Sequence, residues 1–335
     1  MVLLAIFDVI WPLVSLTSFA LAAVAVYRYH NQPDPDAPVS VNYFPSRQCN
    51  YSCGFCFHTE TTSNMLTLDK AKQGLRLLKE AGMRKLNIAG GEPFLHPRSL
   101  AQILEYCKEE LHVDSVSIIS NGSKIRRDFL AKYGKYIDIL GISCDSFVGA
   151  TNEKIGRGED GDAHIQQLSN IATWCKEYGI KLKINTVVNA YNWDEDMTAH
   201  IAELAPFRWK VFQCLIVEGE NEDETRVRDA RRFLVTDEQW QTFCERHKHL
   251  ECYIPEDNET MANSYLNLDE DMCFLDKGEG RMKRSGSILD IGVKKAMEGI
   301  NWDKEAFQRR GGVYDWSKED GGCASGLADK KELEW

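Results

Sequence analysis

Strand and helix patterns alternate along most of this chain, and the alternation limits the possible folds more than any other feature. Short runs rich in Val, Ile and Leu are separated by longer segments whose apolar residues recur at helical spacing. This order predicts βα units and a parallel sheet. Six expected strands predict a partial (βα)6 barrel, since closure requires eight. The expected strands are residues 39–44, 85–89, 115–120, 137–143, 181–188 and 209–216, and the expected helices are residues 67–81, 98–110, 125–133, 164–178, 194–204 and 236–249.

Three cysteines follow the first expected strand with C-x3-C-x2-C spacing: Cys49, Cys53 and Cys56. An iron–sulfur cubane is usually held by four cysteines, so three leave one iron with an open coordination position, which a catalytic metal centre needs. A structural zinc site would need further ligands, usually from a second C-x2-C pair, which this chain lacks. Chance clustering of thiols is the other alternative. The spacing is typical of radical S-adenosylmethionine (SAM) enzymes, in which SAM chelates the open iron.

The charge and the cysteine content limit the partners and the compartment. The chain has 40 basic and 51 acidic residues, a formal net charge of −11. Broad nucleic-acid binding requires a basic face, so we expect no direct nucleic-acid binding. A few basic groups in one pocket would still bind a small phosphorylated ligand. The eleven cysteines show no pairing rhythm outside the motif, which favours a reducing compartment.

The first thirty residues are strongly apolar. Residues 9–26 form an uncharged run at the lower length limit for a membrane span. A signal peptide would carry basic residues before this run, and none is present; a buried core helix is the other alternative. We interpret residues 1–30 as a membrane anchor and the proline-rich residues 31–38 as a linker. Residues 39–250 are then the barrel, and residues 251–335 a C-terminal extension of short helices and turns.

Polar and glycine-containing motifs follow the ends of the expected strands, where barrel enzymes place their chemistry. Each motif alone is also compatible with an ordinary turn. Two adjacent glycines let the backbone approach a ligand closely, and an arginine between glycines is suited to binding a carboxylate. The residues that we single out are Phe57 after the third cysteine, Gly90, Gly91 and Glu92 after the second strand, Ser120 and Asn121 after the third, Ser143 after the fourth, and Arg157.

Basic residues recur within the expected strands. Strand alternation places Lys183 and Asn185 on one face together with Lys181, and it places Arg208 and Lys210 on one face of the next strand. Cations that point into a barrel are unfavourable unless they meet anions. These charges are therefore either paired with acidic neighbours or part of a polyphosphate pocket. Because the chain has no Gly-rich phosphate loop, side chains would have to bind the phosphates.

These segments together resemble the viperin family of radical SAM enzymes. The similarity runs from about Ser40 to Trp335 and rests on the segments VNYFPSRQCNYSCGFCFHT, AGGEPF, SVSIISNGS, GISCDSF, IGRG, RWKVFQCL, EGEN, ERHK and SILDIGV. The resemblance implies a partial (βα)6 radical SAM barrel with a [4Fe–4S] cluster on the three motif cysteines. SAM would lie against the residues singled out above, which are Phe57, Gly90, Gly91, Glu92, Ser120, Asn121, Ser143 and Arg157.

The resemblance also implies a reaction. SAM is cleaved to a 5′-deoxyadenosyl radical, which takes the 4′ hydrogen of a ribonucleoside triphosphate, and the 3′ hydroxyl leaves as water. CTP is the family's usual substrate, UTP is the runner-up, and the 3′-deoxy-3′,4′-didehydro product terminates viral RNA chains. The alternatives are another substrate, such as a sugar nucleotide, and an antiviral membrane scaffold without catalysis. The implied substrate contacts are Asn42, Lys85, Lys183, Asn185, Arg208, Lys210 and Tyr265.

Further expectations concern partners and the C-terminal region. The resemblance implies an electron donor, iron–sulfur delivery through Trp335, and attachment to the cytosolic face of the endoplasmic reticulum or to lipid droplets. The basic run at residues 281–284 and Tyr265 are expected lid elements. Residues 321–331 (GGCASGLADKK) depart from the family pattern as an insertion. We interpret Cys323 as part of that insertion and not as a fourth cluster ligand.

Overall fold

The computed structural model of the protein describes residues 36–276 and 283–318. The described residues from Pro38 to Lys318 belong to one compact unit. The expected membrane anchor, the insertion with Cys323, and Trp335 lie outside the described residues. Within the described ranges, no helix combines the length and the apolar character that crossing a membrane requires.

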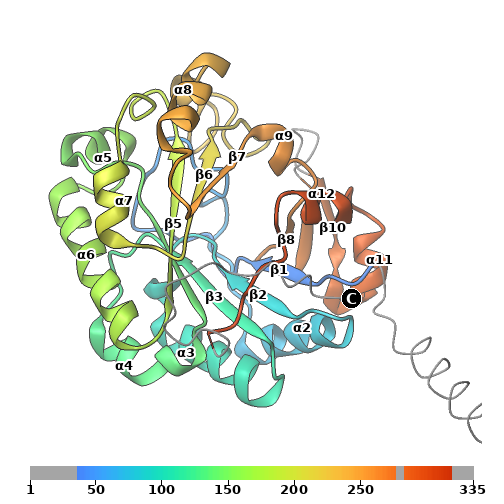
Figure 1. The fold of residues 1–335 in the computed structure, drawn as a ribbon. Coiled ribbons are helices and arrows are strands. Elements are labelled where there is room, and N and C mark those ends of the chain that lie inside the picture. The colour runs from blue at the N-terminus through green and yellow to red at the C-terminus, as the bar shows by residue number, and fades with distance from the viewer. Residues whose placement is uncertain (1–35, 277–282, 319–335) are drawn as a thin grey trace, which may run out of the picture. The chain divides into compact units, whose positions relative to one another are not determined.

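A ten-stranded sheet forms the framework of this unit, in the order β10-β9-β8-β1-β2-β3-β4-β5-β6-β7 (Figure 1). Strands β1 to β7 run parallel to one another and follow the order of the chain. The predicted α/β fold with a parallel sheet is therefore confirmed. These strands are β1 (Ser40–Tyr43), β2 (Lys85–Ile88), β3 (Ser115–Ser120), β4 (Ile139–Ser143), β5 (Lys181–Val188), β6 (Arg208–Gln213) and β7 (Tyr253–Glu256).

Helices connect each of the strands β1 to β7 to the next and cover one face of this parallel sheet (Figure 1). Each helix predicted from the sequence is present, with bounds that differ by a few residues. One helix, α5, was not predicted. The helices are α2 (Leu68–Glu80), α3 (Pro97–Glu105), α4 (Arg127–Tyr133), α5 (Gly149–Ile155), α6 (Gly161–Glu177), α7 (Thr198–Leu204) and α8 (Asp237–His247).

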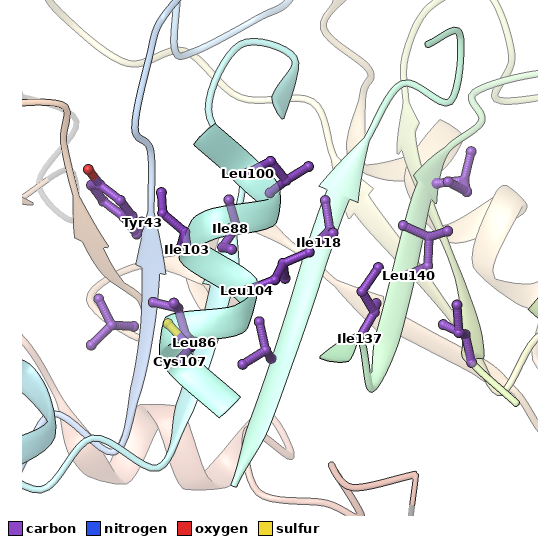
Figure 2. Close-up of a cluster of buried hydrophobic side chains, with 14 of the residues drawn as sticks. Tyr43, Leu86, Ile88, Leu100, Ile103, Leu104, Cys107, Ile118, Ile137 and Leu140 are labelled. Carbon is purple, nitrogen blue, oxygen red and sulfur yellow. The ribbon is translucent and has the colours of Figure 1, made fainter. Parts of the chain in front are cut away.

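The apolar core lies between these helices and the sheet (Figure 2). On α3, Leu100, Ile103 and Leu104 share a face through their i, i+3 and i+4 spacing, and all three are buried. They lie over the strands that carry Leu86 and Ile118, which are fully buried. Burial of each such side chain contributes roughly 1.5–3 kcal/mol. Because strand residues alternate, this packing directs the other face of β2 and β3 toward the barrel interior.

The sheet continues beyond the six predicted strands at both edges. Strand β7 pairs with β6, and β8 (Leu266–Leu268) pairs in parallel with β1. Strands β9 (Cys273–Asp276) and β10 (Lys283–Ser287) add an antiparallel ladder. Strand β7 contains Pro255, which is tolerated because β7 lies at the edge of the sheet. A strand as short as β8 shows no alternation, and its partner lies about 225 positions earlier, as the Asn42–Asn267 bond shows.

Residues 310–318 cross the end of the barrel opposite the cysteine motif. The hydroxyl of Ser115, the first residue of β3, donates to the carbonyl of Trp316 at 3.0 Å. The Lys181 ammonium at the start of β5 lies 2.6 Å from the Asp315 carboxylate. This segment thus covers the N-terminal ends of the central strands. It follows the short helices α9 (Asn258–Met261), α10 (Ile288–Ile291), α11 (Val293–Met297) and α12 (Lys304–Arg309).

Candidate functional site

A cavity of about 570 Å³ occupies the interior of the barrel. It is lined by inward-facing strand residues, the loop that carries the motif cysteines, and residues of the C-terminal extension. Of the predicted site residues, only Glu92 and Arg208 do not line it. Those that do are Cys49, Cys53, Cys56, Phe57, Gly90, Gly91, Ser120, Asn121, Ser143, Arg157, Asn42, Lys85, Lys183, Asn185, Lys210 and Tyr265.

The loop after β1 (residues 44–67, the cysteine loop) is held against the end of β2 by backbone hydrogen bonds. The N–H of Gly91 donates to the Ser46 carbonyl at 2.9 Å, and the N–H of Glu92 donates to the Gln48 carbonyl at 2.7 Å. A Cβ atom at position 91 would lie 1.9 Å from the Gln48 oxygen, so only glycine fits. The close backbone approach predicted at this glycine pair is therefore an approach to the cysteine loop, next to the cavity.

The turn after α5 holds the other side of the cysteine loop. The N–H groups of Ser52 and Gly54 donate to the carbonyls of Gly156 and Ile155 at 3.1 and 3.0 Å. Gly156 has φ +93°, a left-handed conformation, and a Cβ there would lie 2.5 Å from the Ser52 oxygen. The glycine that precedes Arg157 in the sequence is thus required by contact with the cysteine loop.

The three motif cysteines fit an iron–sulfur cluster. None forms a disulfide, and all three line the same cavity. The Tyr51 N–H lies 3.4 Å from the Cys49 sulfur. Burial raises the pKa of the Cys49 thiol, and it raises that of Cys53 to about 12, so metal binding must displace protons. In the described part of the chain, no three His, Cys, Asp or Glu side chains converge on a single-ion position. In a cubane, each cysteine binds a different iron.

Glu92 joins the ends of β2 and β3. It is 2% exposed, and its carboxylate accepts hydrogen bonds from the Phe94 N–H at 3.0 Å, the Ser120 hydroxyl at 2.8 Å and the Asn121 N–H at 2.7 Å. Burial raises the pKa of Glu92, against the opposing effect of these donors. The resemblance to the radical SAM family implied that Glu92 contacts SAM, but Glu92 does not line the cavity. The Glu92 oxygens accept hydrogen bonds from other residues of the chain, and these bonds position Ser120 and Asn121, which line the cavity.

Arg157 reaches the cavity from a buried ion pair. Its Nε lies 2.5 Å from Oδ2 of Asp145, which is fully buried and accepts a second hydrogen bond from the Val187 N–H at 2.8 Å. Burial opposes the guanidinium charge, but Asp145 together with the Cys53 and Cys144 thiols outweighs it, so the pKa of Arg157 is raised. The arginine is therefore charged and held in one orientation at the cavity wall. Asp145 was not among the predicted site residues, although it lies two residues after Ser143 in the segment GISCDSF.

The register of β5 and β6 places polar residues of the two strands side by side at two positions along the barrel interior. Lys183 pairs with Arg208, and Asn185 pairs with Lys210, along β5 and β6. Lys183 is 8% exposed and Lys85 is 2% exposed, and neither forms an ion pair with any residue in the described ranges. Burial lowers the pKa of Lys85 well below its usual value and that of Lys183 to about 8. An anionic ligand in the cavity would neutralise these two buried lysines, which have no ion-pair partner in the described ranges.

Lys210 belongs to a buried group that also contains Glu256, Tyr265 and Arg310. Its Nζ lies 2.8 Å from the Tyr265 hydroxyl and contacts Glu256. The Arg310 guanidinium lies 3.7 Å from the Tyr265 ring centroid and 3.7 Å from the Glu256 carboxylate. Burial would raise the pKa of Glu256, but Lys210 and Arg310 outweigh it and hold this pKa below its usual range. Arg310, which also lines the cavity, was not predicted.

Arg208 does not line the cavity but packs against Tyr314, which does. Its guanidinium lies 4.0 Å from the ring centroid of Tyr314, whose hydroxyl accepts from Lys85 at 2.7 Å. The contact between Arg208 and substrate implied by the resemblance therefore stays a prediction. Charges paired with acidic neighbours, the alternative weighed from the sequence, describe Lys181 and Lys210 but not Lys85 or Lys183.

The fold and the three-cysteine site define a radical SAM enzyme. Residues 43–205 match the radical SAM superfamily. The solved structure of anSMEcpe with bound AdoMet has the same fold, with a TM-score of 0.59, 14% sequence identity, and coverage of 80% of this chain and 83% of that chain. The protein's cofactors are accordingly a [4Fe–4S] cluster, on the motif that contains Cys49, Cys53 and Cys56, and SAM.

Two curated relatives identify the family within this class. The S-adenosylmethionine-dependent nucleotide dehydratase RSAD2 of Danio rerio is 54% identical over 285 residues, which cover 84% of this chain and 79% of the relative. The protein of the same name from Oncorhynchus mykiss is 52% identical, with coverage of 84% and 82%. The chain belongs to the family of S-adenosylmethionine-dependent nucleotide dehydratases, which confirms the resemblance drawn from the sequence.

Proposed function

We propose that the protein removes water from a ribonucleoside triphosphate, with CTP as the preferred substrate and UTP as the alternative. The observation that carries this proposal is a single cavity lined by three motif cysteines at one end and by buried, unpaired lysines toward the other. The product would be the 3′-deoxy-3′,4′-didehydro nucleotide. A cluster held by Cys49, Cys53 and Cys56 would supply the electron for reductive cleavage of SAM, and SAM would supply the group that abstracts the 4′ hydrogen of the nucleotide.

The residues of this chain orient the substrate and protect it. Lys85 and Lys183 bind phosphate oxygens, because burial without a carboxylate partner makes an anionic ligand favourable there. Asn185 has a buried side-chain oxygen without a hydrogen-bond partner, and it lies beside Lys210 in the register of β5 and β6. A triphosphate bound among these groups would direct its ribose toward the cysteine loop. Residues of the C-terminal extension line the cavity, and this cover would keep water away from a reactive radical.

The test uses reconstituted, reduced protein with SAM and each common ribonucleoside triphosphate. The expected result is formation of 5′-deoxyadenosine that depends on nucleotide and is strongest with CTP. Lys183→Met should abolish most of this dependence. Lys181→Met is a matched control, since Lys181 lies on the same face of β5 but pairs with Asp315 and does not line the cavity. A protein that forms no 5′-deoxyadenosine with any of the four nucleotides would refute the proposal.

We also propose an antiviral role at a membrane surface. The supporting observations are the apolar residues 1–30, the terminal Trp335 and the family membership. In this proposal the anchor holds the enzyme on the cytosolic face of the endoplasmic reticulum or on lipid droplets, and the terminal tryptophan recruits iron–sulfur delivery. Deletion of residues 1–30 should disperse the protein in cells, and Cys53→Ala should remove the antiviral effect. An effect that survives Cys53→Ala would favour a scaffold without catalysis.

A further inference from the structure

Arg47 lies two residues before the first cluster cysteine and is almost fully enclosed. Its side chain is 5% exposed and contacts two buried carboxylates, those of Glu220 at 0% and Glu270 at 2% exposure. Nε donates to Glu270 at 2.9 Å, and Nη1 donates to both oxygens of Glu220 at 3.1 and 3.2 Å. A guanidinium offers several N–H donors in a fixed plane, so one side chain can serve both carboxylates at once.

The same three side chains join the two ends of the cysteine loop. Arg47 also donates to the carbonyl of Thr59 at 3.1 Å, three residues after the last cysteine. The Thr59 N–H and hydroxyl donate back to Glu220 at 3.3 and 3.4 Å. The Thr62 hydroxyl donates to Glu270 at 2.7 Å. The loop that carries the three thiols is therefore closed at its base by a buried polar network.

The two carboxylates come from opposite sides of the open barrel. Glu220 lies in the segment that follows β6, and Glu270 lies in the turn between β8 and β9. Strand β8 pairs with β1, whereas β6 lies near the other edge of the sheet. The neighbouring Asn221 adds a further contact, because its side-chain amide donates to the Phe55 carbonyl within the cysteine loop at 3.0 Å. Arg47 thus links the loop to both sides of a barrel that strand pairing does not close.

We propose that Arg47, held between Glu220 and Glu270, is a positioning residue for the iron–sulfur cluster. The three side chains fix the base of the cysteine loop so that the thiols keep the spacing that the cluster requires. The role depends on the donor geometry of the guanidinium as well as on its charge. A lysine at this position would keep the charge but lose the planar set of donors. The inference concerns retention of the cluster and does not depend on which nucleotide is the substrate.

The experiment compares iron retention in variants of the reconstituted full-length protein. In Arg47→Lys, we expect a folded protein from which a chelator removes iron roughly 10-fold faster than from the wild type, the scale seen when groups that orient metal ligands are altered. The electron paramagnetic resonance signal of the reduced cluster should also change. The triple variant R47M/E220Q/E270Q carries no buried charge at this position, so it avoids unpaired carboxylates, and it should lose iron as fast as Arg47→Lys.

A matched control lies at the opposite end of the barrel. Asp138 is fully buried and accepts from Lys108 at 3.0 Å and from the Val116 N–H at 2.8 Å. Asp138→Asn should lower the melting temperature but leave the rate of iron loss unchanged. The proposal is overturned if the Arg47 variants retain iron like the wild type, or if Asp138→Asn loses iron equally fast, which would indicate general destabilisation. A wild type that holds iron but makes no nucleotide product would refute the proposed function and not this one.

Discussion

Replacing Lys183 by methionine should stabilise the nucleotide-free protein and weaken nucleotide binding at the same time. The lysine is buried, has no ion-pair partner in the described residues, and has a pKa lowered from 10.5 to about 8. Burial is the main cause, and Lys85 and Arg208 add to it. At about 1.4 kcal/mol per pKa unit, the charged form is disfavoured in the fold by roughly 3 kcal/mol. Methionine fills similar space without that charge.

The two expected effects of Lys183→Met go in opposite directions, because the nucleotide-free protein becomes more stable while its affinity for the nucleotide falls. Near pH 7, the free energy of unfolding of the nucleotide-free variant should rise by about 2–3 kcal/mol, which corresponds to a rise in Tm of roughly 5 °C. Binding of CTP should lose a charge-assisted contact in a buried site, so the Kd should rise by roughly 30-fold or more. Thermal unfolding measures the first effect, and calorimetric titration of the SAM-loaded protein measures the second. A variant with lower Tm and unchanged Kd would refute the assignment of Lys183 to a phosphate pocket.

Three further predictions concern the cysteine loop, the SAM side of the cavity and pH. Gly91→Ala should destabilise the fold by more than ~3 kcal/mol and lower the iron content after reconstitution, because the added methyl would overlap the Gln48 carbonyl. Full iron content in this variant would contradict the packing argument. Asp145→Asn should raise the Kd for SAM roughly 10-fold or more in calorimetry, since Arg157 loses its buried anionic partner; an unchanged Kd would show that the pair is structural only. Stability and binding should depend on pH in opposite directions. The unfolded chain keeps the Lys183 proton up to about pH 10.5, whereas the fold releases it near pH 8, so the free energy of unfolding should rise between these values. Nucleotide affinity should fall above pH 8, because phosphate favours the charged lysine. Lys183→Met should flatten both profiles.

The parts of the fold that depend on local pattern were predictable from the sequence. Alternation along β5 and β6 placed Lys183, Asn185 and Lys210 on the same side as the cavity, and the structure confirms that placement. The ends of parallel strands meet at one edge of a sheet, so the cysteine loop and the motif at Gly91 were expected to lie together. They do, through direct backbone hydrogen bonds.

Contacts between distant segments were not predictable. Arg310 and Tyr314 line the cavity, but they follow short helices in a region without strand or helix periodicity. Arg47 contacts carboxylates about 173 and 223 positions away. No local pattern in the sequence identifies such partners among the many exposed acidic residues. Burial and geometry, which only the folded chain provides, separate Glu220 and Glu270 from the rest.

The most direct test of the central claim is mass spectrometry of the products formed from an equimolar mixture of the four ribonucleoside triphosphates. The reconstituted, reduced protein is incubated with this mixture and SAM. We expect one nucleotide product that is derived from CTP and is lighter than its substrate by one water, together with one 5′-deoxyadenosine per product. Formation of 5′-deoxyadenosine at the same rate without nucleotide, and with no dehydrated product in the mixture, would contradict this expectation.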